Sequence, residues 1–142
     1  MSDGYREMLR QMAEAKSGKK PRKRPGDEEH RIQVACVNWF CYQHRKMRHK
    51  LFSVPNGGYR SAKTAAAMKE EGQLAGVSDL IFLHRTKQYG ALLIEMKTPK
   101  GKQSDKQEEW QALIEPEGYK YVVCHSLEEF QTEIETYLSM EQ

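Results

Sequence analysis

Long apolar runs, paired cysteines and grouped histidines are all missing from this sequence of 142 residues. Only 38% of the residues are hydrophobic, and no apolar stretch approaches the roughly 20 residues that a membrane-spanning helix requires. The first residues, MSDGYREMLR, also lack the continuous apolar segment of a secretory signal. We therefore expect a cytoplasmic protein without a membrane partner.

The cysteines and histidines do not form a recognisable metal motif. Cys36, Cys41 and Cys124 are an odd number without a CxxC pair, and the five histidines show no HExxH grouping. We interpret the cysteines as reduced thiols that pack in the core, and we do not expect a zinc site.

The net charge of +3 is unevenly distributed along the chain. Residues 1–26 contain eight basic and three acidic residues, a net charge of +5, which leaves −2 for residues 27–142. Because the basic segment also contains Pro and Gly and few apolar residues, we expect a flexible arm at 1–26 and one folded domain at 27–142. The arm either binds phosphates, with Lys19, Lys20 and Arg22 as candidate contacts, or serves as a solubilising tail.

Apolar periodicity predicts an α/β domain with the element order αβαββαβα. Helices are expected from residue 27, over 61–72, from 104 to near 118 and from 126 onward, and strands over 51–54, 76–85, 91–97 and 119–125. Capping boxes begin the last two helices at Ser104 and Ser126. Their expected buried stripes are Trp110, Leu113 and Ile114 in one helix, and Leu127, Phe130, Ile134 and Leu138 in the other. The alternation favours a mixed sheet with helices on its faces.

Two charged side chains on the apolar stretch 91–97 indicate the functional site. Because side chains alternate in a strand, Glu95 and Lys97 lie on one face. The opposite face is apolar and consists of Leu92, Ile94 and Met96. Burying an acid and an amine costs free energy unless a partner or a metal compensates for the lost hydration. Asp79 opens the preceding strand, so a hairpin would bring its carboxylate towards Glu95.

Two neighbouring carboxylates and an amine suit metal-dependent phosphodiester hydrolysis. Carboxylates repel each other unless a cation lies between them, and Mg²⁺ accepts one or two carboxylates together with waters, a phosphate oxygen and a backbone carbonyl, here that of Met96. The cation would polarise the phosphate, while Lys97 would position the attacking water or stabilise the charged phosphate. The alternative is an ordinary ion pair between Glu95 and Lys97 on an edge strand, because an ExK pattern alone is weak.

Several spaced segments resemble the PD-(D/E)XK nucleases and, within them, the virus-type replication-repair nuclease family, VRR-NUC. The matching pieces are EHRIQ at 29–33, VPNGG at 54–58, Gly72, GVSDL at 76–80, IEMK at 94–97, Gly101, Ser104, Gln107 and GY at 118–119. Together they cover about residues 27–127. The sequence departs from the family at Ser78, where a Pro that is not a ligand usually precedes the aspartate.

The resemblance implies a restriction-endonuclease-like fold and DNA cleavage that depends on Mg²⁺ or Mn²⁺, with Asp79, Glu95 and Lys97 as the catalytic set. Gln107 matches the family's glutamine near the catalytic lysine, although it also occupies the capping-box position. Glu29 matches a first-helix acid that can approach the metal. Alternatively, Glu29 only stabilises the start of the helix through the helix dipole.

Stand-alone viral members of the family resemble Holliday junction resolvases and act as homodimers, which implies a homodimeric, phage-type endonuclease for branched DNA. The alternatives are a nuclease for flapped, single-stranded or ordinary duplex DNA, and a non-catalytic DNA-binding module. The last helix and the Trp39–Phe40 region are candidate dimer surfaces, although both aromatics also suit a core. Phosphate contacts are expected outside the arm as well, with solvated surface as the alternative. These candidates are Asn56, Tyr59, Arg60, Lys63, Arg45 and Lys46.

Overall fold

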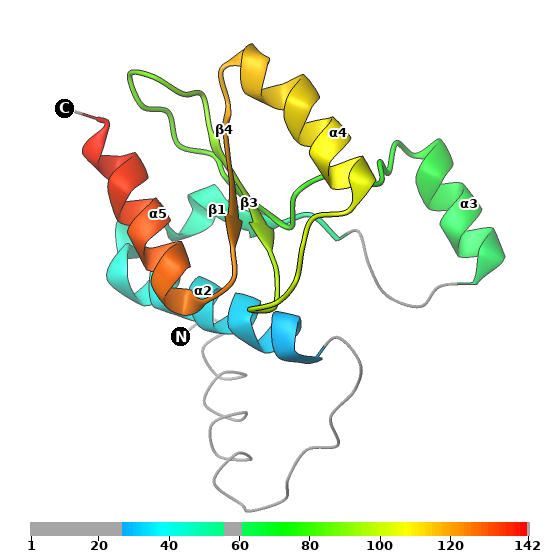
Figure 1. Ribbon diagram of the computed structural model, residues 1–142, viewed down its shortest axis with the longest axis horizontal. Helices are drawn as coiled ribbons and strands as arrows, with labels where there is room; N and C mark the ends of the chain where they lie inside the picture. The colour runs from blue at the N-terminus through cyan, green and yellow to red at the C-terminus, as the bar shows by residue number, and fades with distance from the viewer. Residues whose placement is uncertain (1–26, 56–60, 142) are drawn as a thin grey trace, which may run out of the picture.

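The computed structural model describes residues 27–55 and 61–141, and their helices and strands follow the predicted order (Figure 1). The elements are α2 (Asp27–Gln43), the 3-10 helix η1 (Arg45–Lys50), β1 (Leu51–Ser53), α3 (Ala62–Glu70), β2 (Leu80–Phe82), β3 (Leu92–Met96), α4 (Asp105–Ile114), the 3-10 helix η2 (Glu115–Glu117), β4 (Lys120–Cys124) and α5 (Leu127–Ser139). The predicted arm at 1–26 and the Asn-Gly-Gly turn at 56–58 lie outside the described residues.

The strands of the described residues form one mixed sheet in the order β1-β2-β3-β4. β1 pairs with β2 and β2 pairs with β3 in antiparallel fashion, whereas β3 and β4 are parallel. The parallel pair requires a crossover, which α4 and η2 provide between the two strands. The mixed α/β sheet predicted from the sequence is confirmed.

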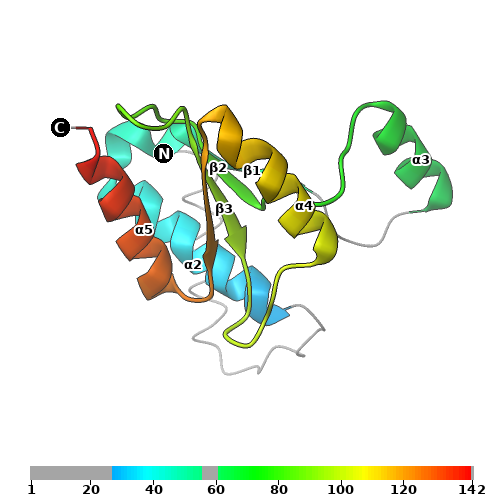
Figure 2. The same ribbon diagram turned by 45° about the horizontal axis from the view of Figure 1, so that its top comes forward.

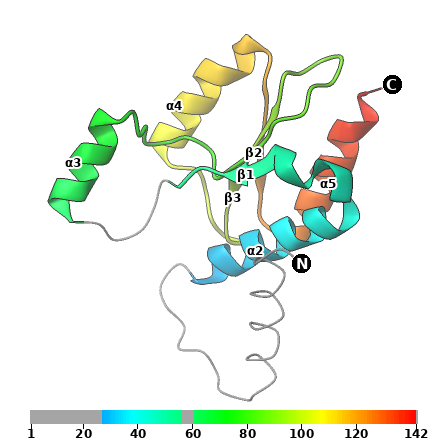
Figure 3. The ribbon, with the colours of Figure 1, turned by 180° about the vertical axis from the view of Figure 1, so that it is seen from behind.

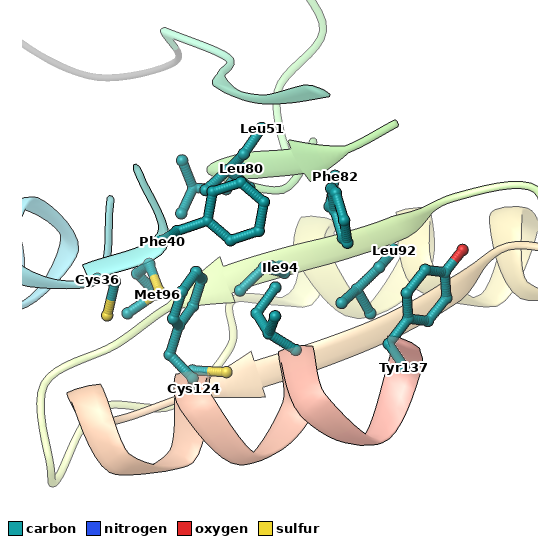
Figure 4. Close-up of a cluster of buried hydrophobic side chains, with 12 residues drawn as sticks. Cys36, Phe40, Leu51, Leu80, Phe82, Leu92, Ile94, Met96, Cys124 and Tyr137 are labelled. Carbon is teal, nitrogen blue, oxygen red and sulfur yellow. The ribbon is translucent and has the colours of Figure 1, made fainter. Parts of the chain in front are cut away.

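The hydrophobic core lies between the sheet and the helices α2 and α5 (Figure 4). The inward-facing residues of β3 are Leu92, Ile94 and Met96, as their alternation predicts, and all three are fully buried. Phe40 of α2 and Phe130 of α5 are also fully buried. Figures 1 and 2 show α4 on the other side of the sheet, which is therefore covered on both faces.

Three details of the packing differ from the predictions. Leu113 of α4 is 69% exposed, so the expected apolar stripe of this helix is wrong at that position. The buried stripe of α5 includes Tyr137, whose hydroxyl donates a hydrogen bond of 2.6 Å to the carbonyl oxygen of His84. Phe40 is completely buried, which rules it out as a dimer surface, and Trp39 is half-buried and packs edge-on against Phe130, so both aromatics take the core position that was the alternative.

Helix α3 stands apart from the rest of the described structure (Figure 3). The Ser61 side chain caps the helix by accepting a hydrogen bond from the Thr64 amide. None of its residues is buried, and it makes no extensive contact with another helix or strand. Across residues 27–55 and 61–141, no helix is long and apolar enough to cross a membrane.

Candidate active site

The hairpin of β2 and β3 brings Asp79 to the end of the strand that carries Glu95. Asp79 immediately precedes β2, and Leu80 is paired with Ile94. The Oδ2 atom of Asp79 accepts a hydrogen bond of 2.8 Å from the backbone amide of Met96. The Asp79 carboxylate is therefore held beside the backbone that follows Glu95, as expected from the predicted pairing of the two strands in a hairpin.

Glu95 is only 1% exposed, and two side chains contact the same carboxylate oxygen. The Lys97 Nζ atom lies 2.9 Å from Glu95 Oε1, and the Gln107 Nε2 atom donates a hydrogen bond of 2.5 Å to that oxygen. The other oxygen, Oε2, is buried and has no hydrogen-bond partner among the described residues. One oxygen of Glu95 is thus fixed, and the second is left for another ligand.

Gln107 joins this carboxylate to the start of α4. Its Oε1 atom accepts a hydrogen bond of 2.8 Å from the Ser104 amide, while the Ser104 hydroxyl accepts one from the Gln107 amide, which completes a capping box. The same side-chain amide reaches Glu95 through Nε2. Both roles expected for Gln107, helix capping and placement in the site, are therefore seen together.

The electrostatic environment leaves the site short of positive charge. Burial and, after it, the nearby Asp79 carboxylate raise the pKa of Glu95, while Lys97 lowers it, and the net pKa is about 7. Burial also raises the pKa of Glu29, while the charge of Lys97 lowers it and that of Asp79 raises it. Glu29 therefore faces the same site from α2.

The residues present fit a divalent cation. A buried oxygen without a donor, beside a second carboxylate, is a costly arrangement that a cation would compensate. No group of three or more His, Cys, Asp or Glu side chains among the described residues is close enough to hold a metal. Mg²⁺ does not require such a group, because one or two carboxylates suffice when waters and a phosphate complete its octahedron.

A family model for the VRR-NUC domain matches residues 19–128, most of the chain. The chain belongs to the VRR-NUC family. It therefore carries a nuclease domain of the PD-(D/E)XK type, with DNA as its partner. A solved structure of a VRR_NUC domain protein is 26% identical, with a TM-score of 0.69 over 80% of this chain and 89% of that chain. No curated protein matches the sequence.

Among the described residues, the basic residues expected to contact DNA lie away from the carboxylates, whereas Lys97 lies 2.9 Å from Glu95. Lys63 is exposed on α3. Arg45 and Lys46 are exposed on η1, which leads into Leu51 at the end of the sheet opposite to the one that carries Glu95. Six other candidate contacts lie outside the described residues: Lys19, Lys20, Arg22, Asn56, Tyr59 and Arg60.

Sequence reasoning did not identify Tyr121 as part of the surroundings of Glu95. Tyr121 is buried on β4, and burial followed by the charge of Glu95 raises its pKa. The β3–β4 register pairs Glu95 with Val123 and Leu93 with Tyr121, so these residues share one face. Strand alternation alone, with the pairing known, would have placed Tyr121 there.

Proposed function

We propose that this VRR-NUC protein is a divalent-metal-dependent DNA endonuclease whose catalytic residues are Asp79, Glu95, Lys97 and Gln107. The observation that carries the proposal is the state of the Glu95 carboxylate. It is almost fully buried, Lys97 and Gln107 contact one oxygen, and the other oxygen lacks a hydrogen-bond partner among the described residues. A purely structural ion pair does not need an acid with an orphaned oxygen beside a second carboxylate.

Each residue has a separate task in this mechanism. Asp79 and Glu95 would hold Mg²⁺ or Mn²⁺, with the Met96 carbonyl as a further ligand and Glu29 on α2 as an additional candidate. A cation held there would supply the Lewis acidity that polarises a phosphate and lowers the pKa of a bound water. Gln107 keeps one oxygen of Glu95 occupied, which orients the other. Lys97 Nζ, positioned by its 2.9 Å contact with Glu95, orients the water or stabilises charge on the phosphate.

The proposed substrate is branched DNA such as a four-way junction, cut by a homodimer. A two-fold dimer places two identical sites on opposed strands, which symmetric cleavage of a junction requires. Exposed basic residues supply contacts to phosphates, which position DNA without reading its sequence. The proposed contacts are Lys63, Arg45 and Lys46 together with Lys19, Lys20, Arg22, Asn56, Tyr59 and Arg60.

The test is cleavage of a matched panel of four-way junction, flap, single-stranded and linear duplex DNA with Mg²⁺ or Mn²⁺, and with EDTA. Asp79→Ala and Lys97→Ala should abolish cutting, and Lys97→Ala should still bind DNA. Asp105→Ala and Lys69→Ala are the matched controls, because both residues are exposed and lie outside the site.

The outcomes separate the parts of the proposal. Cutting confined to the junction, and lost in both site variants, supports a resolvase. Cutting of other forms keeps the site but contradicts the substrate. Full activity of Lys97→Ala contradicts the site, and binding without cutting of any form would indicate a non-catalytic DNA-binding module.

A further inference from the structure

We propose that His125, which follows β4, is a positioning residue for Lys97. The inference rests on the nuclease function proposed above and concerns a residue that lies within the matched range 19–128 but is not one of the motif residues named for the family. His125 touches neither of the proposed carboxylate ligands in any contact of the described structure. It acts instead on the segment 98–103, which connects Lys97 to the Ser104 cap of α4.

The segment is folded tightly against Lys97 itself. The Gly101 amide donates a hydrogen bond of 2.9 Å to the carbonyl oxygen of Thr98, which closes a turn. A Cβ atom added at Gly101 would lie 3.2 Å from the Lys97 Cβ and 3.0 Å from the Thr98 Oγ1. With so little space, a displacement of Gly101 is transmitted to the lysine.

This segment is held at both ends by Cys124, the last residue of β4, and by His125, which follows it. The Lys97 amide donates a hydrogen bond of 2.9 Å to the carbonyl oxygen of Cys124. The His125 Nε2 atom lies 3.2 Å from the carbonyl oxygen of Gly101 and donates to it. Cys124 therefore fixes the backbone at Lys97, and His125 fixes it at Gly101.

His125 is in turn fixed by the first turn of α5. Its backbone amide and its Nδ1 atom lie 2.7 Å and 3.1 Å from the same oxygen, Glu129 Oε2. These contacts, the backbone hydrogen bond first, lower the pKa of Glu129. A carbonyl oxygen can only accept a hydrogen bond, so the contact with Gly101 is a hydrogen bond that the ring donates from Nε2.

The other end of the segment leads back to the same site. The Ser104 amide donates a hydrogen bond to the Gln107 side chain, which in turn donates one to Glu95. The segment held by His125 therefore carries Lys97 at one end and, at the other end, the residues that hold Glu95 in place. A misplacement of about 1 Å in such a cluster can slow a reaction by about a hundredfold. The contact between His125 and Gly101 is thus placed to affect the rate rather than DNA affinity.

The test compares His125→Leu, which keeps the bulk and loses the donor, with His125→Gln, whose amide can donate to the Gly101 carbonyl. His125→Leu should lower kcat by about tenfold to a hundredfold with little change in KM. His125→Gln should recover much of the loss. Ser126→Ala is the control, because it removes the α5 cap, and so destabilises that helix, without changing either group of the His125–Gly101 contact.

A second readout does not depend on cleavage. In metal-free protein without DNA, the NMR amide signals of Lys97 and Gly101 should move in His125→Leu and stay near their original positions in Ser126→Ala. Unchanged signals, unchanged kcat, equal losses in the Leu and Gln variants, or an equal loss of kcat in Ser126→Ala would each overturn the proposal. If the unaltered protein cuts no DNA, the proposed function fails and the NMR comparison alone decides on His125.

Discussion

At the scale of single residues, the carboxyl group of Glu95 is held where its charge is costly. Without metal, the folded protein keeps the proton on Glu95 up to a pKa of about 7, whereas the ordinary value is 4.5. Between these values the folded state binds more protons than the unfolded state. The free energy of unfolding therefore falls as the pH rises from about 4.5 to about 7.

Replacing this acid should remove that pH dependence. In EDTA, the Tm of the unaltered protein should fall relative to that of Glu95→Gln as the pH rises through this range. Added Mg²⁺ should raise the Tm of the unaltered protein most at the upper end, because the ion requires the ionised carboxylate and binds only the folded state. Thermal unfolding across the pH range measures both effects, and parallel curves for the two proteins would contradict the assigned pKa.

Gly76 joins the loop before Asp79 to the start of α4. Its φ angle is +93°, and an added Cβ would collide with the carbonyl oxygen of Lys106, one residue before Gln107. Gly72 also has a positive φ, of +101°, but an added Cβ there would meet no atom within 4 Å. A comparison of substitutions at the two glycines therefore separates the effect of backbone strain from that of a steric clash.

We expect Gly72→Ala to cost about 1 kcal/mol from backbone strain alone. Gly76→Ala should cost clearly more and should also reduce cleavage, because the clash pushes α4 and Asp79 apart. Urea denaturation and the cleavage rate measure the two effects. Equal losses of stability in both variants would show that the contact with Lys106 gives way easily.

At the scale of helices and strands, α3 and α4 are joined to the domain very differently. Gln107 and Trp110 of α4 contact Glu95 and Tyr121 of the sheet, whereas α3 has no buried residue. A nine-residue helix is too short to be stable alone in water. We therefore expect α3 to unfold locally, without the rest of the domain.

Ala66 and Ala112 allow a matched test, because both are exposed and lie inside α3 and α4 respectively. Ala112→Gly should lower the free energy of global unfolding by about 1 kcal/mol. Ala66→Gly should change it little, and the amides of α3 should exchange with solvent faster than those of α4. Urea titrations and hydrogen exchange test this, and a similar loss in both variants would mean that α3 unfolds together with the domain.

Local patterns predicted most elements, and they failed where long-range packing decides. The alternation in β3 correctly placed Glu95 on the face opposite to that of Leu92, Ile94 and Met96, and the capping box at Ser104 was recognisable from residue types. The exposure of Leu113 could not be recognised from residue types, because it depends on how far α4 extends beyond the sheet. The 3-10 helix at Arg45–Lys50 was not predicted, and only Arg45 and Lys46 were singled out in it as candidate phosphate contacts, since such short helices have little sequence signal.

The candidate site shows the same division. The proximity of Asp79 and Glu95 follows from two adjacent strands that pair as a hairpin, which the sequence predicts. The position of Tyr121 depends on a parallel pair formed after a crossover, and no local pattern specifies that register. The distance between the η1 lysines and arginines and the carboxylates likewise depends on the whole sheet.

At the scale of the whole molecule, the basic 3-10 helix η1 and the carboxylates of the site occupy opposite ends of the sheet. Leu51, next to η1, pairs with Phe82, which pairs with Leu92, and Glu95 lies three residues further along β3. Such a separation is about 10 Å along the strand. Contacts at η1 should therefore contribute to DNA binding without affecting the chemical step.

Lys46→Gln should weaken DNA binding and reduce the slope of log affinity against log salt by about 0.9, with kcat unchanged at saturating DNA. Lys69→Gln, which removes an exposed charge from α3, is the matched control and should leave the slope nearly unchanged. Binding titrations over a range of salt concentrations, with Asp79→Ala to prevent cutting, measure the slope. Equal slopes for the two variants would identify η1 as solvated surface.

The position of α5 has a consequence for how the protein is made. Asp79, Glu95, Lys97 and Gln107 have all been synthesised before α5 begins at Leu127, yet the core needs Phe130, Ile134 and Tyr137 of this helix. A nascent chain that has just completed β4 therefore carries the whole proposed catalytic set without a closed core. The domain should close its core, and the proposed catalytic set become functional, only once α5 has left the ribosome.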